Sequence, residues 1–364
     1  MKLSDAYRVV KDSIKNNTPI MLWGAPGIGK SSLIQQIAVE MDRHVLDLRL
    51  AQLEPTDLRG VPMPDNTIGR ARWYLPAFWP DRAETDMEKK VETTDKDGNK
   101  KTTTITIKAG NCLNGPGIVF LDEIEKAPIS VKNASLQLVL DRSIGTYQLP
   151  DDWAIVCAGN REEDGCFSAP LGAALSNRMI HLDIEADVDA WGMWARDNGV
   201  LDDIIGFLYF KPELLYKQTE EHAFPTPRSW VMASSLSENC KTQKEQKELI
   251  GAAVGRSAAQ EYVVWQNVYK SVDPEKVFAG EMPDLGSGKD QSYRYAVALA
   301  VSFALKKRKG GIKKAEEHIA KFLELLSPEL RVCFLRQQSL NIMESMAKHP
   351  AFKSQVSSIM KIAV

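Results

Sequence analysis

Short runs of apolar residues alternate with longer amphipathic stretches in the first half of the chain. The runs predict buried β-strands, because strands covered on both faces of a parallel sheet carry apolar side chains in succession. The amphipathic stretches place apolar residues three and four positions apart, which predicts helices. Strands are expected at residues 20–23, 44–48, 118–121, 153–158 and 179–182, and helices at residues 4–16, 33–41 and 130–140. This alternation predicts an α/β fold with a five-stranded parallel sheet, whose ligands lie at the carboxyl ends of the strands.

Beyond residue 183 the pattern is helical, with a linker rich in Gly, Pro and Asp at residues 280–288. Apolar residues recur at helical spacing in all of these segments. Helices are expected at residues 187–197, 201–209, 229–239, 243–270, 291–308, 312–326, 328–346 and 350–362.

A long connection at about residues 54–117 separates the second and third predicted strands. Connections of this length inside a compact domain are usually functional or inserted. Its polar part, residues 84–108, has Asp97-Gly98-Asn99 flanked by alternating Thr, Val and Ile, which predicts an exposed β-hairpin. Its aromatic side chains form either a small satellite core or a surface that grips a substrate chain. These side chains are Trp73, Tyr74, Phe78 and Trp79. Because three nearby prolines fix the path of the chain, we expect most of the four to be packed.

The first predicted strand leads into a glycine loop and then into a helix. Residues 24–31 match the pattern G-x-x-x-x-G-K-[ST] at every fixed position. Glycines let successive backbone N–H groups point into one concavity that holds phosphate oxygens. The helix N-terminus adds positive charge, the lysine reaches the β- and γ-phosphates, and the serine hydroxyl can ligate Mg²⁺. We therefore expect a nucleotide to bind at Gly24, Ala25, Pro26, Gly27, Ile28, Gly29, Lys30, Ser31 and Ser32.

Polar side chains follow two other predicted strands directly. Asp122 and Glu123 end the apolar run at residues 118–121, and Asn160 follows the strand at residues 153–158 through a glycine. A carboxylate beside a phosphate loop can hold Mg²⁺ together with Ser31, and a second can polarise the attacking water. Asn160 is placed to hydrogen-bond either the γ-phosphate or that water.

Two arginines complete the candidate site. Arg178 immediately precedes the fifth predicted strand, and Arg228 follows Pro227 at a predicted helix start. A guanidinium group binds two oxygens at once and is suited to neutralising the charge on a transferring phosphoryl group. In isolation, each arginine fits a surface ion pair better than a catalytic role.

Composition narrows the function classes further. The net charge of −2 gives no general reason to expect nucleic acid or an anionic membrane as partner. Five scattered cysteines without a C-x-x-C pair disfavour a zinc site or a disulfide framework.

No stretch approaches the roughly 20 apolar residues that span a bilayer, and no leader-like segment opens the chain, so we expect a cytoplasmic protein. From Lys306 onward, twelve Lys and Arg against five Asp and Glu indicate either a solvated helix face or a docking surface for an acidic partner.

The order of these motifs resembles that of the AAA+ ATPases, and more narrowly the MoxR branch, relatives of the magnesium-chelatase motor subunit. The resemblance covers residues 1 to about 270. It rests also on three stretches that are typical of the branch: an insert that includes residues 57–60 and 72–76, a hairpin-like segment at 142–149, and the sequence at 254–262.

The resemblance implies a role for each candidate residue. Gly24 to Ser31 are expected to form the Walker A loop, Asp122 to associate with Mg²⁺ and Glu123 to act as general base. Asn160 is expected to be sensor 1 and Arg228 sensor 2. Arg178 is expected to be an arginine finger acting on ATP in a neighbouring subunit.

The resemblance also implies an organisation and partners. The expected domains are an AAA+ core at 1–198 with the insert at about 54–117, a helical lid at 199–272, and a further helical region at 273–364. The expected assembly is a hexameric ring that remodels a protein partner, such as a von Willebrand A-domain protein.

Two other functions remain open. A nucleic-acid motor would require a basic surface, which only the C-terminal region offers. A nucleotide-gated scaffold would bind its partner without turnover. Since no N-K-x-D segment is present, ATP is expected rather than GTP.

Overall fold

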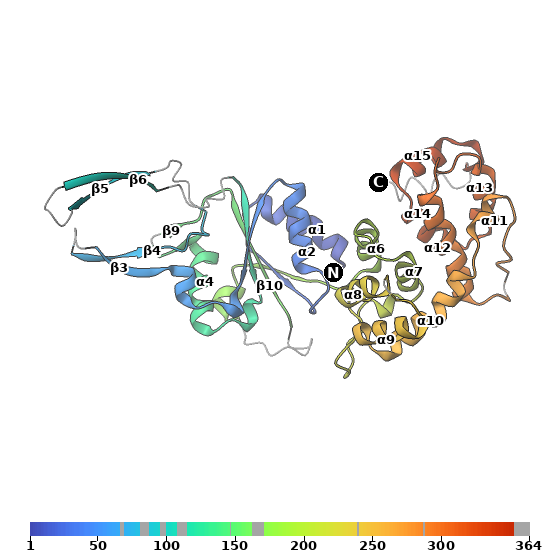
Figure 1. Cartoon of the computed structure of the whole chain (residues 1–364), viewed down its shortest axis with the longest axis horizontal. Helices are drawn as coiled ribbons and strands as arrows, with labels where there is room; N and C mark the ends of the chain where they lie inside the picture. Colours follow the sequence, from blue (N-terminus) through green and yellow to red (C-terminus); the bar gives the residue numbers. More distant parts are fainter. Residues whose placement is uncertain are drawn as a thin grey trace. The chain divides into compact units, whose positions relative to one another are not determined.

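The computed structural model describes residues 1–65, 69–80, 87–94, 100–107, 115–145, 147–161, 171–238, 240–286 and 288–352, with the backbone alone at 87–94, 100–107 and 174. The chain divides into two compact units, Met1–Glu185 and Ala186–Val364 (Figure 1).

The first unit is built on five parallel strands in the order β11-β1-β10-β7-β2. Their sequences are mostly apolar, and every side chain of the central strand β10 is buried. This is the pattern of a sheet covered on both faces. The predicted α/β fold with a five-stranded parallel sheet is confirmed, with strands at Ile20–Trp23 (β1), His44–Arg49 (β2), Gly117–Asp122 (β7), Trp153–Gly159 (β10) and Ile180–Asp183 (β11).

Helices cover both faces of this sheet (Figure 1). Helices α1 (Leu3–Lys15) and α2 (Lys30–Glu40) lie on one face, and α4 (Ile129–Asp141) lies on the other. Alternate strand residues point to opposite faces. On the α4 side, Met21, Val119 and Cys157 join Val131 and Leu138 in one buried cluster. The described part of the unit also contains two short helices, α3 (Pro55–Arg59) and α5 (Ala173–Ser176), and two 3₁₀ turns, η1 (Leu50–Gln52) and η2 (Ile124–Lys126).

Besides the parallel sheet, the described residues of the first unit form three two-stranded antiparallel ribbons. The hairpin predicted within residues 84–108 is confirmed by the pairing of Met87–Thr94 (β5) with Lys100–Ile107 (β6), while its predicted turn at residues 97–99 lies outside the described residues. The hairpin-like segment at 142–149 contains the paired strands Ser143–Ile144 (β8) and Tyr147–Gln148 (β9). A further ribbon pairs Val61–Asp65 (β3) with Arg70–Tyr74 (β4).

The aromatic side chains of the insert separate into two pairs. Trp79 is buried, lies 5.5 Å from the Tyr147 ring and donates a hydrogen bond of 2.9 Å to the carbonyl of Leu58. Phe78 packs against the buried cluster to which Trp79 belongs. Trp73 and Tyr74, by contrast, are 52% and 58% exposed. The prediction of packing therefore holds for Phe78 and Trp79 and is wrong for Trp73 and Tyr74, because the β3–β4 ribbon has no layer above it among the described residues.

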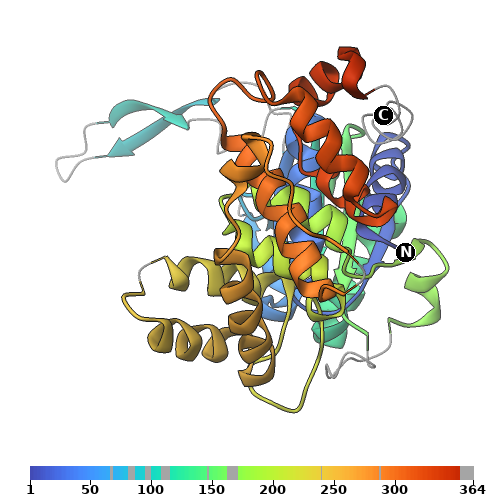
Figure 2. The same cartoon turned by 90° about the vertical axis from the view of Figure 1, so that its right-hand side faces the viewer.

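The second unit is helical over its described residues (Figure 2). Several helices begin at side chains that accept a hydrogen bond from the first turn, including Thr226, Thr242, Ser327 and Ser339. The helices are Val188–Asp197 (α6), Asp202–Phe210 (α7), Pro227–Ser237 (α8), Gln243–Val254 (α9), Arg256–Lys270 (α10), Pro274–Phe278 (α11), Gln291–Lys307 (α12), Glu316–Leu325 (α13), Pro328–Arg336 (α14) and Leu340–Lys348 (α15), with 3₁₀ turns at Pro212–Leu214 and Pro350–Phe352.

Two predicted long helices are each broken in two. The helix expected at 243–270 stops at Gly255, which has a φ of +86°. A Cβ at this position would lie 2.8 Å from the Ala223 carbonyl oxygen, so both the backbone conformation and the close approach require glycine. The helix expected at 328–346 is interrupted after Arg336, and Ser339 caps a new one. The helix expected from residue 312 begins only at Glu316, and most of the one expected at 350–362 lies outside the described residues.

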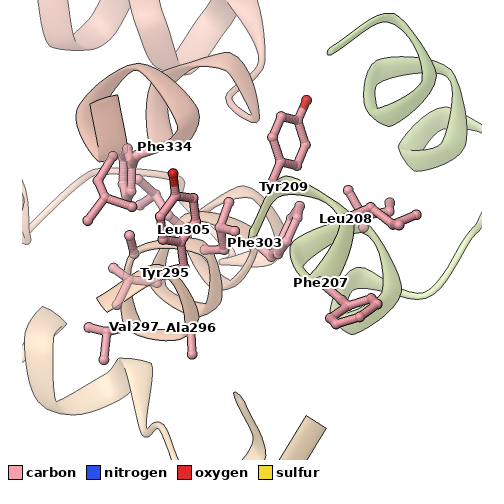
Figure 3. Close-up of a cluster of buried hydrophobic side chains, with 14 of the residues drawn as sticks. Phe207, Leu208, Tyr209, Tyr295, Ala296, Val297, Phe303, Leu305 and Phe334 are labelled. Atoms are coloured by element: carbon pink, nitrogen blue, oxygen red, sulfur yellow. The ribbon is translucent and has the colours of Figure 1, made fainter. Parts of the chain in front are cut away.

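One core runs through the second unit (Figure 3). Helix α12 is buried on nearly every side, and its Tyr295, Leu299 and Phe303 share a cluster with Phe207 of α7 and Phe334 of α14. The predicted boundary near residue 272 falls inside this cluster, and the three-domain division stays a prediction. Among the described residues, no helix combines the length and apolarity that crossing a bilayer requires.

Candidate functional site

The phosphate loop connects β1 to α2 and is shaped by its glycines. Gly27 and Gly29 have φ values of +80° and +105°, in the left-handed region that favours glycine. A Cβ on Gly24 would lie 2.7 Å from the carbonyl oxygen of Ile184, so this position has no room for a side chain. The Ile184 N–H in turn donates a hydrogen bond of 2.7 Å to the Trp23 carbonyl. The loop therefore packs directly against the last residues of the first unit.

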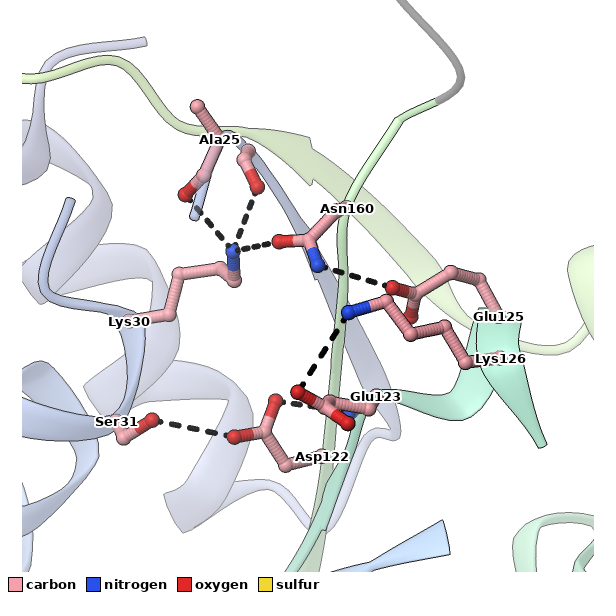
Figure 4. A network of polar contacts seen from close by, with 9 residues as sticks. Ala25, Lys30, Ser31, Asp122, Glu123, Glu125, Lys126 and Asn160 are labelled. Carbon is pink, nitrogen blue, oxygen red and sulfur yellow. Dashed lines mark hydrogen bonds and ion pairs between the residues drawn. The ribbon is translucent and has the colours of Figure 1, made fainter. Parts of the chain in front are cut away.

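Lys30 is the first residue of α2 and is only 8% exposed. Its ammonium group donates to the carbonyl oxygens of Gly24 (2.6 Å) and Ala25 (3.1 Å) and to Oδ1 of Asn160 (2.8 Å) (Figure 4). The lysine charge is thus held over the loop at the carboxyl edge of the sheet. The next two residues differ in exposure: Ser31 is half-buried, and Ser32 is exposed.

Asp122 ends strand β7 and faces the start of α2. The Ser31 hydroxyl donates a hydrogen bond of 3.3 Å to Oδ2 of Asp122, and the other carboxylate oxygen accepts from the Glu123 N–H at 2.9 Å (Figure 4). A hydroxyl and a carboxylate are the hard oxygen ligands that Mg²⁺ prefers, and this ion is usually bound by one or two carboxylates together with substrate phosphates. The described residues contain no group of three or more His, Cys, Asp and Glu side chains that could hold a metal ion without a ligand. The pair of Ser31 and Asp122 fits that mode of binding.

Glu123 has φ +55° and ψ +35°, a left-handed conformation that is uncommon for a residue with a side chain. Non-glycine residues in such conformations cluster at functional sites. The Glu123 carboxylate lies 3.6 Å from the ammonium group of Lys126 and remains partly exposed. It is therefore accessible to water beside Asp122.

Asn160 directly follows strand β10, which lies between β1 and β7 in the sheet. Its Oδ1 accepts from Lys30, and its Nδ2 donates a hydrogen bond of 3.1 Å to Oε1 of Glu125 (Figure 4). Parallel strands bring their carboxyl ends to one edge, and this explains why residues 91 and 130 positions away in the chain meet Ser31 and Lys30.

Sequence reasoning missed Glu125. This carboxylate is 1% exposed and lies on η2, which turns it back beneath the end of β10. The only signal in the sequence is Gly159, whose missing side chain leaves space for Glu125 (2.6 Å from a Cβ position to Oε2). That signal becomes readable only once the two segments are known to be neighbours.

Burial also changes proton affinities around the site. Burial lowers the pKa of Lys132, whose ammonium group donates to the Glu125 carbonyl at 2.8 Å, and the Glu125 charge acts in the opposite direction. Partial burial raises the pKa of Asp47, with a further contribution from Asp122, while Arg49 lowers it. Negative charge is thus concentrated where Asp47 and Asp122 lie on neighbouring strands.

The two arginines predicted for the site belong to other parts of the chain. Arg178 is exposed and lies two residues before β11, whose first residue pairs with Ile20, the first residue of β1. The phosphate loop follows the other end of β1, so Arg178 lies at the opposite edge of the sheet. Arg228 belongs to the second unit, where it is exposed in the first turn of α8.

Comparison with known proteins finds one family model that matches part of the first unit. Residues 20–176 match the sequence model of AAA, the ATPase family associated with various cellular activities. Among curated protein sequences, none matches the chain.

Solved structures with a similar arrangement share little sequence with the chain. A candidate ATPase of Cytophaga hutchinsonii is 16% identical, with a TM-score of 0.31, 70% of this chain covered and 81% of that chain. RuvB of Thermotoga maritima, a Holliday junction branch migration motor, is 11% identical, with a TM-score of 0.31 and coverage of 99% and 85%. NtrX of Brucella abortus in complex with ATP is 12% identical, with a TM-score of 0.31 and coverage of 100% and 68%. At these scores the structures support no conclusion about function.

The matched segment contains the phosphate loop, Asp122, Glu123 and Asn160. Members of this family hydrolyse ATP, generally with Mg²⁺, and typically form oligomers. The strand order and the matched segment lead to the same conclusion: residues 20–176 have the AAA fold and are similar to the AAA family of ATPases, and the chain is an ATP-hydrolysing enzyme.

Proposed function

We propose that this chain is an AAA ATPase of the MoxR branch that couples Mg²⁺-dependent ATP hydrolysis to the remodelling of a protein partner, as a ring of identical subunits. The observation that carries the proposal is the convergence of Lys30, Ser31, Asp122 and Asn160 at one sheet edge, through hydrogen bonds of 2.8 Å and 3.3 Å. These four side chains come from the start of α2 and from the ends of two strands that are far apart in the sequence.

Each residue at this edge has a distinct role in the proposed reaction. Backbone N–H groups of residues 24–31 and the α2 N-terminus bind phosphate oxygens, and the ammonium group of Lys30 binds the outermost phosphates. Glu123 takes the proton of the attacking water, and Asn160 orients that water or the γ-phosphate. Ser31 and Asp122 would hold Mg²⁺, which would supply positive charge that offsets the charge on the phosphates.

The positions of the two arginines support different roles. Because Arg178 lies at the sheet edge opposite the phosphate loop of its own chain, it is suited to act on the nucleotide of a neighbouring subunit. Its exposure leaves the guanidinium group accessible to a second chain. Arg228, in the first turn of α8, is proposed to be sensor 2, the role that the family resemblance implies.

The partner is proposed to be a protein because of the β3–β4 ribbon. Val61, Met63, Trp73 and Tyr74 are all at least half exposed on it. Exposed apolar side chains that gather on one element mark interaction sites in soluble proteins. Arg72 pairs with Asp65 at 2.9 Å within the ribbon, and Arg70 is exposed on β4, so an extended polypeptide with apolar side chains fits this ribbon. A von Willebrand A-domain protein remains the partner that the family resemblance suggests.

The proposal is tested by comparing Lys30→Ala and Glu123→Gln with the unmodified chain. Fluorescent ATP binding and phosphate release are measured with Mg²⁺ present. We expect Lys30→Ala to lose nucleotide affinity, and Glu123→Gln to bind ATP normally while turnover falls by about 10²-fold or more. Lys15→Ala, at an exposed position of α1, is the matched control and leaves both measurements unchanged.

Normal turnover by Glu123→Gln would show that the base is assigned wrongly. Turnover that rises steeply with added DNA or RNA at low salt would favour a nucleic-acid motor instead. A partner that is bound and activated equally well by Glu123→Gln would favour a scaffold.

A further inference from the structure

Glu125 is a buried carboxylate that the chemistry proposed above does not use. It is 1% exposed, on the 3₁₀ turn that follows Glu123. Its Oε1 accepts a hydrogen bond from Asn160, and among the described residues its Oε2 has no hydrogen-bond partner. Burial of a carboxylate is costly, so a buried one without full hydrogen bonding needs an explanation.

The surroundings of Glu125 are built to accept it. Lys132 of α4 is buried, and its ammonium group donates to the Glu125 carbonyl oxygen at 2.8 Å, which brings a positive charge close to the carboxylate. On the other side, a side chain at Gly159 would lie 2.6 Å from Oε2. The nearby charge of Lys132 favours the carboxylate, and the absence of a side chain at Gly159 leaves the space that it occupies beside Asn160.

This contact determines the orientation of the Asn160 amide. An ammonium group only donates hydrogen bonds and a carboxylate only accepts them, so Oδ1 must face Lys30 and Nδ2 must face Glu125. The opposite orientation would place two donors together at Lys30 and two acceptors together at Glu125. Glu125 and Lys30 therefore hold the amide from its two ends.

We propose that Glu125 is a positioning residue that keeps the amide oxygen of Asn160 directed at the phosphate loop during turnover. When Lys30 transfers its hydrogen bonds to phosphate oxygens, Glu125 still holds Nδ2, and Oδ1 becomes free to accept a hydrogen bond from the attacking water. The inference rests on the proposed function and selects one of the two roles that Asn160 could have there. Glu125 acts only through Asn160 and contacts no reacting atom.

The test is a double-mutant cycle between Glu125 and Asn160, with the turnover rate and the ATP dissociation constant measured at saturating Mg²⁺. The variants are Glu125→Met, which fills the space without an acceptor, Asn160→Ala, and both together. We expect Glu125→Met to lower kcat about tenfold while the dissociation constant changes less than about twofold. The double variant should be no slower than Asn160→Ala alone, because residues that act as a unit are not additive.

Rescue by the conservative variant separates positioning from a purely structural role. Glu125→Gln keeps an acceptor oxygen and should recover kcat to within about threefold of the unmodified chain. Val131→Ala, at a buried position of α4, is the stability control: it should lower the unfolding midpoint and leave kcat unchanged.

Several results would overturn the inference. Glu125→Met with unchanged kcat, or a double variant in which both losses multiply, would show that Glu125 does not act through Asn160. A control variant that loses as much stability and as much kcat as Glu125→Met would also show that Glu125 does not act through Asn160. Failure of the proposed function is recognised separately, since it would leave Glu123→Gln hydrolysing ATP normally.

Discussion

The indole Nε1 of Trp23 donates a hydrogen bond of 2.8 Å to Nδ1 of His181. Because Nδ1 accepts, the proton of this neutral imidazole is on Nε2, which donates at 2.8 Å to the carbonyl oxygen of Ser176. Trp23 immediately precedes the phosphate loop, and Ser176 ends α5 two residues before Arg178. The histidine therefore links the strand that carries the loop to the segment that carries the proposed finger.

Replacement of Trp23 by Phe removes this donor and keeps an aromatic ring. We expect a loss of about 1 kcal/mol in unfolding free energy, measured by urea denaturation, because one hydrogen bond is lost. We also expect a fall in turnover of about threefold. Trp79→Phe is the matched control, since it loses a comparable bond to the Leu58 carbonyl outside the site and should keep its turnover. Equal turnover in the two variants would show that the link has no role in catalysis.

Mixing experiments test whether Arg178 acts on a neighbouring subunit. Arg178→Ala keeps an intact phosphate loop but lacks the finger, whereas Lys30→Ala keeps the finger but does not bind nucleotide. We expect turnover of each variant alone to fall on the order of 10³-fold, and the mixture to regain a measurable fraction of it. Arg8→Ala, at an exposed position of α1, serves as control. Mixed oligomers that form and remain inactive would contradict action between subunits.

The exposed aromatic pair on β4 is expected to serve the partner rather than the fold. Because Trp73 and Tyr74 are more than half exposed, replacing both by Ala should change the unfolding free energy by less than about 1 kcal/mol. Basal turnover should stay within about twofold. Stimulation of turnover by an unfolded protein, reduced and carboxymethylated α-lactalbumin, should be lost. Val264→Ala, an exposed apolar position on α10, is the control. Retained stimulation in the double variant would exclude the ribbon as the contact.

Cys157 gives a pH dependence with a defined sign. This thiol on β10 is fully buried, and burial raises its pKa from 9.0 to about 12. The thiolate is thus disfavoured in the folded state, and the contribution of Cys157 to stability falls as pH rises above about 9, where the unfolded chain ionises first. Thermal unfolding of the unmodified chain and of Cys157→Ala, compared between about pH 7 and pH 10, should show the variant losing less stability. A difference that does not change with pH would contradict the raised pKa.

The sequence predicts the sheet, and it predicts which side chains follow the strands at the carboxyl edge, because both depend on local pattern. Residues 118–121 are four apolar residues followed by Asp122, so the burial of the strand and the position of the carboxylate at its end follow together. The glycine spacing of the loop likewise determines where Lys30 must lie. Prediction of these features required no knowledge of distant contacts.

Features that depend on distant contacts could not be predicted. Glu125 becomes part of the site only because η2 folds under Gly159, 34 residues later in the chain. The helical pattern continues through Gly255, and a glycine within a helix costs only about 1 kcal/mol, so the pattern alone does not predict a break there. The helix ends at Gly255 because the Ala223 carbonyl approaches this residue. Trp73 and Tyr74 have the composition of a small core, but no segment described in the structure covers them.

The packing of Gly24 against Ile184 has a mechanical consequence. The Ile184 N–H is hydrogen-bonded to the Trp23 carbonyl, and Ile184 stands one residue before the end of the first unit. A shift of the phosphate loop by a fraction of an ångström cannot be absorbed at Gly24, where even a methyl group has no room. Such a shift must displace the peptide of Ile184. A movement of the loop on nucleotide binding is therefore transmitted to the backbone segment that leads into the helices.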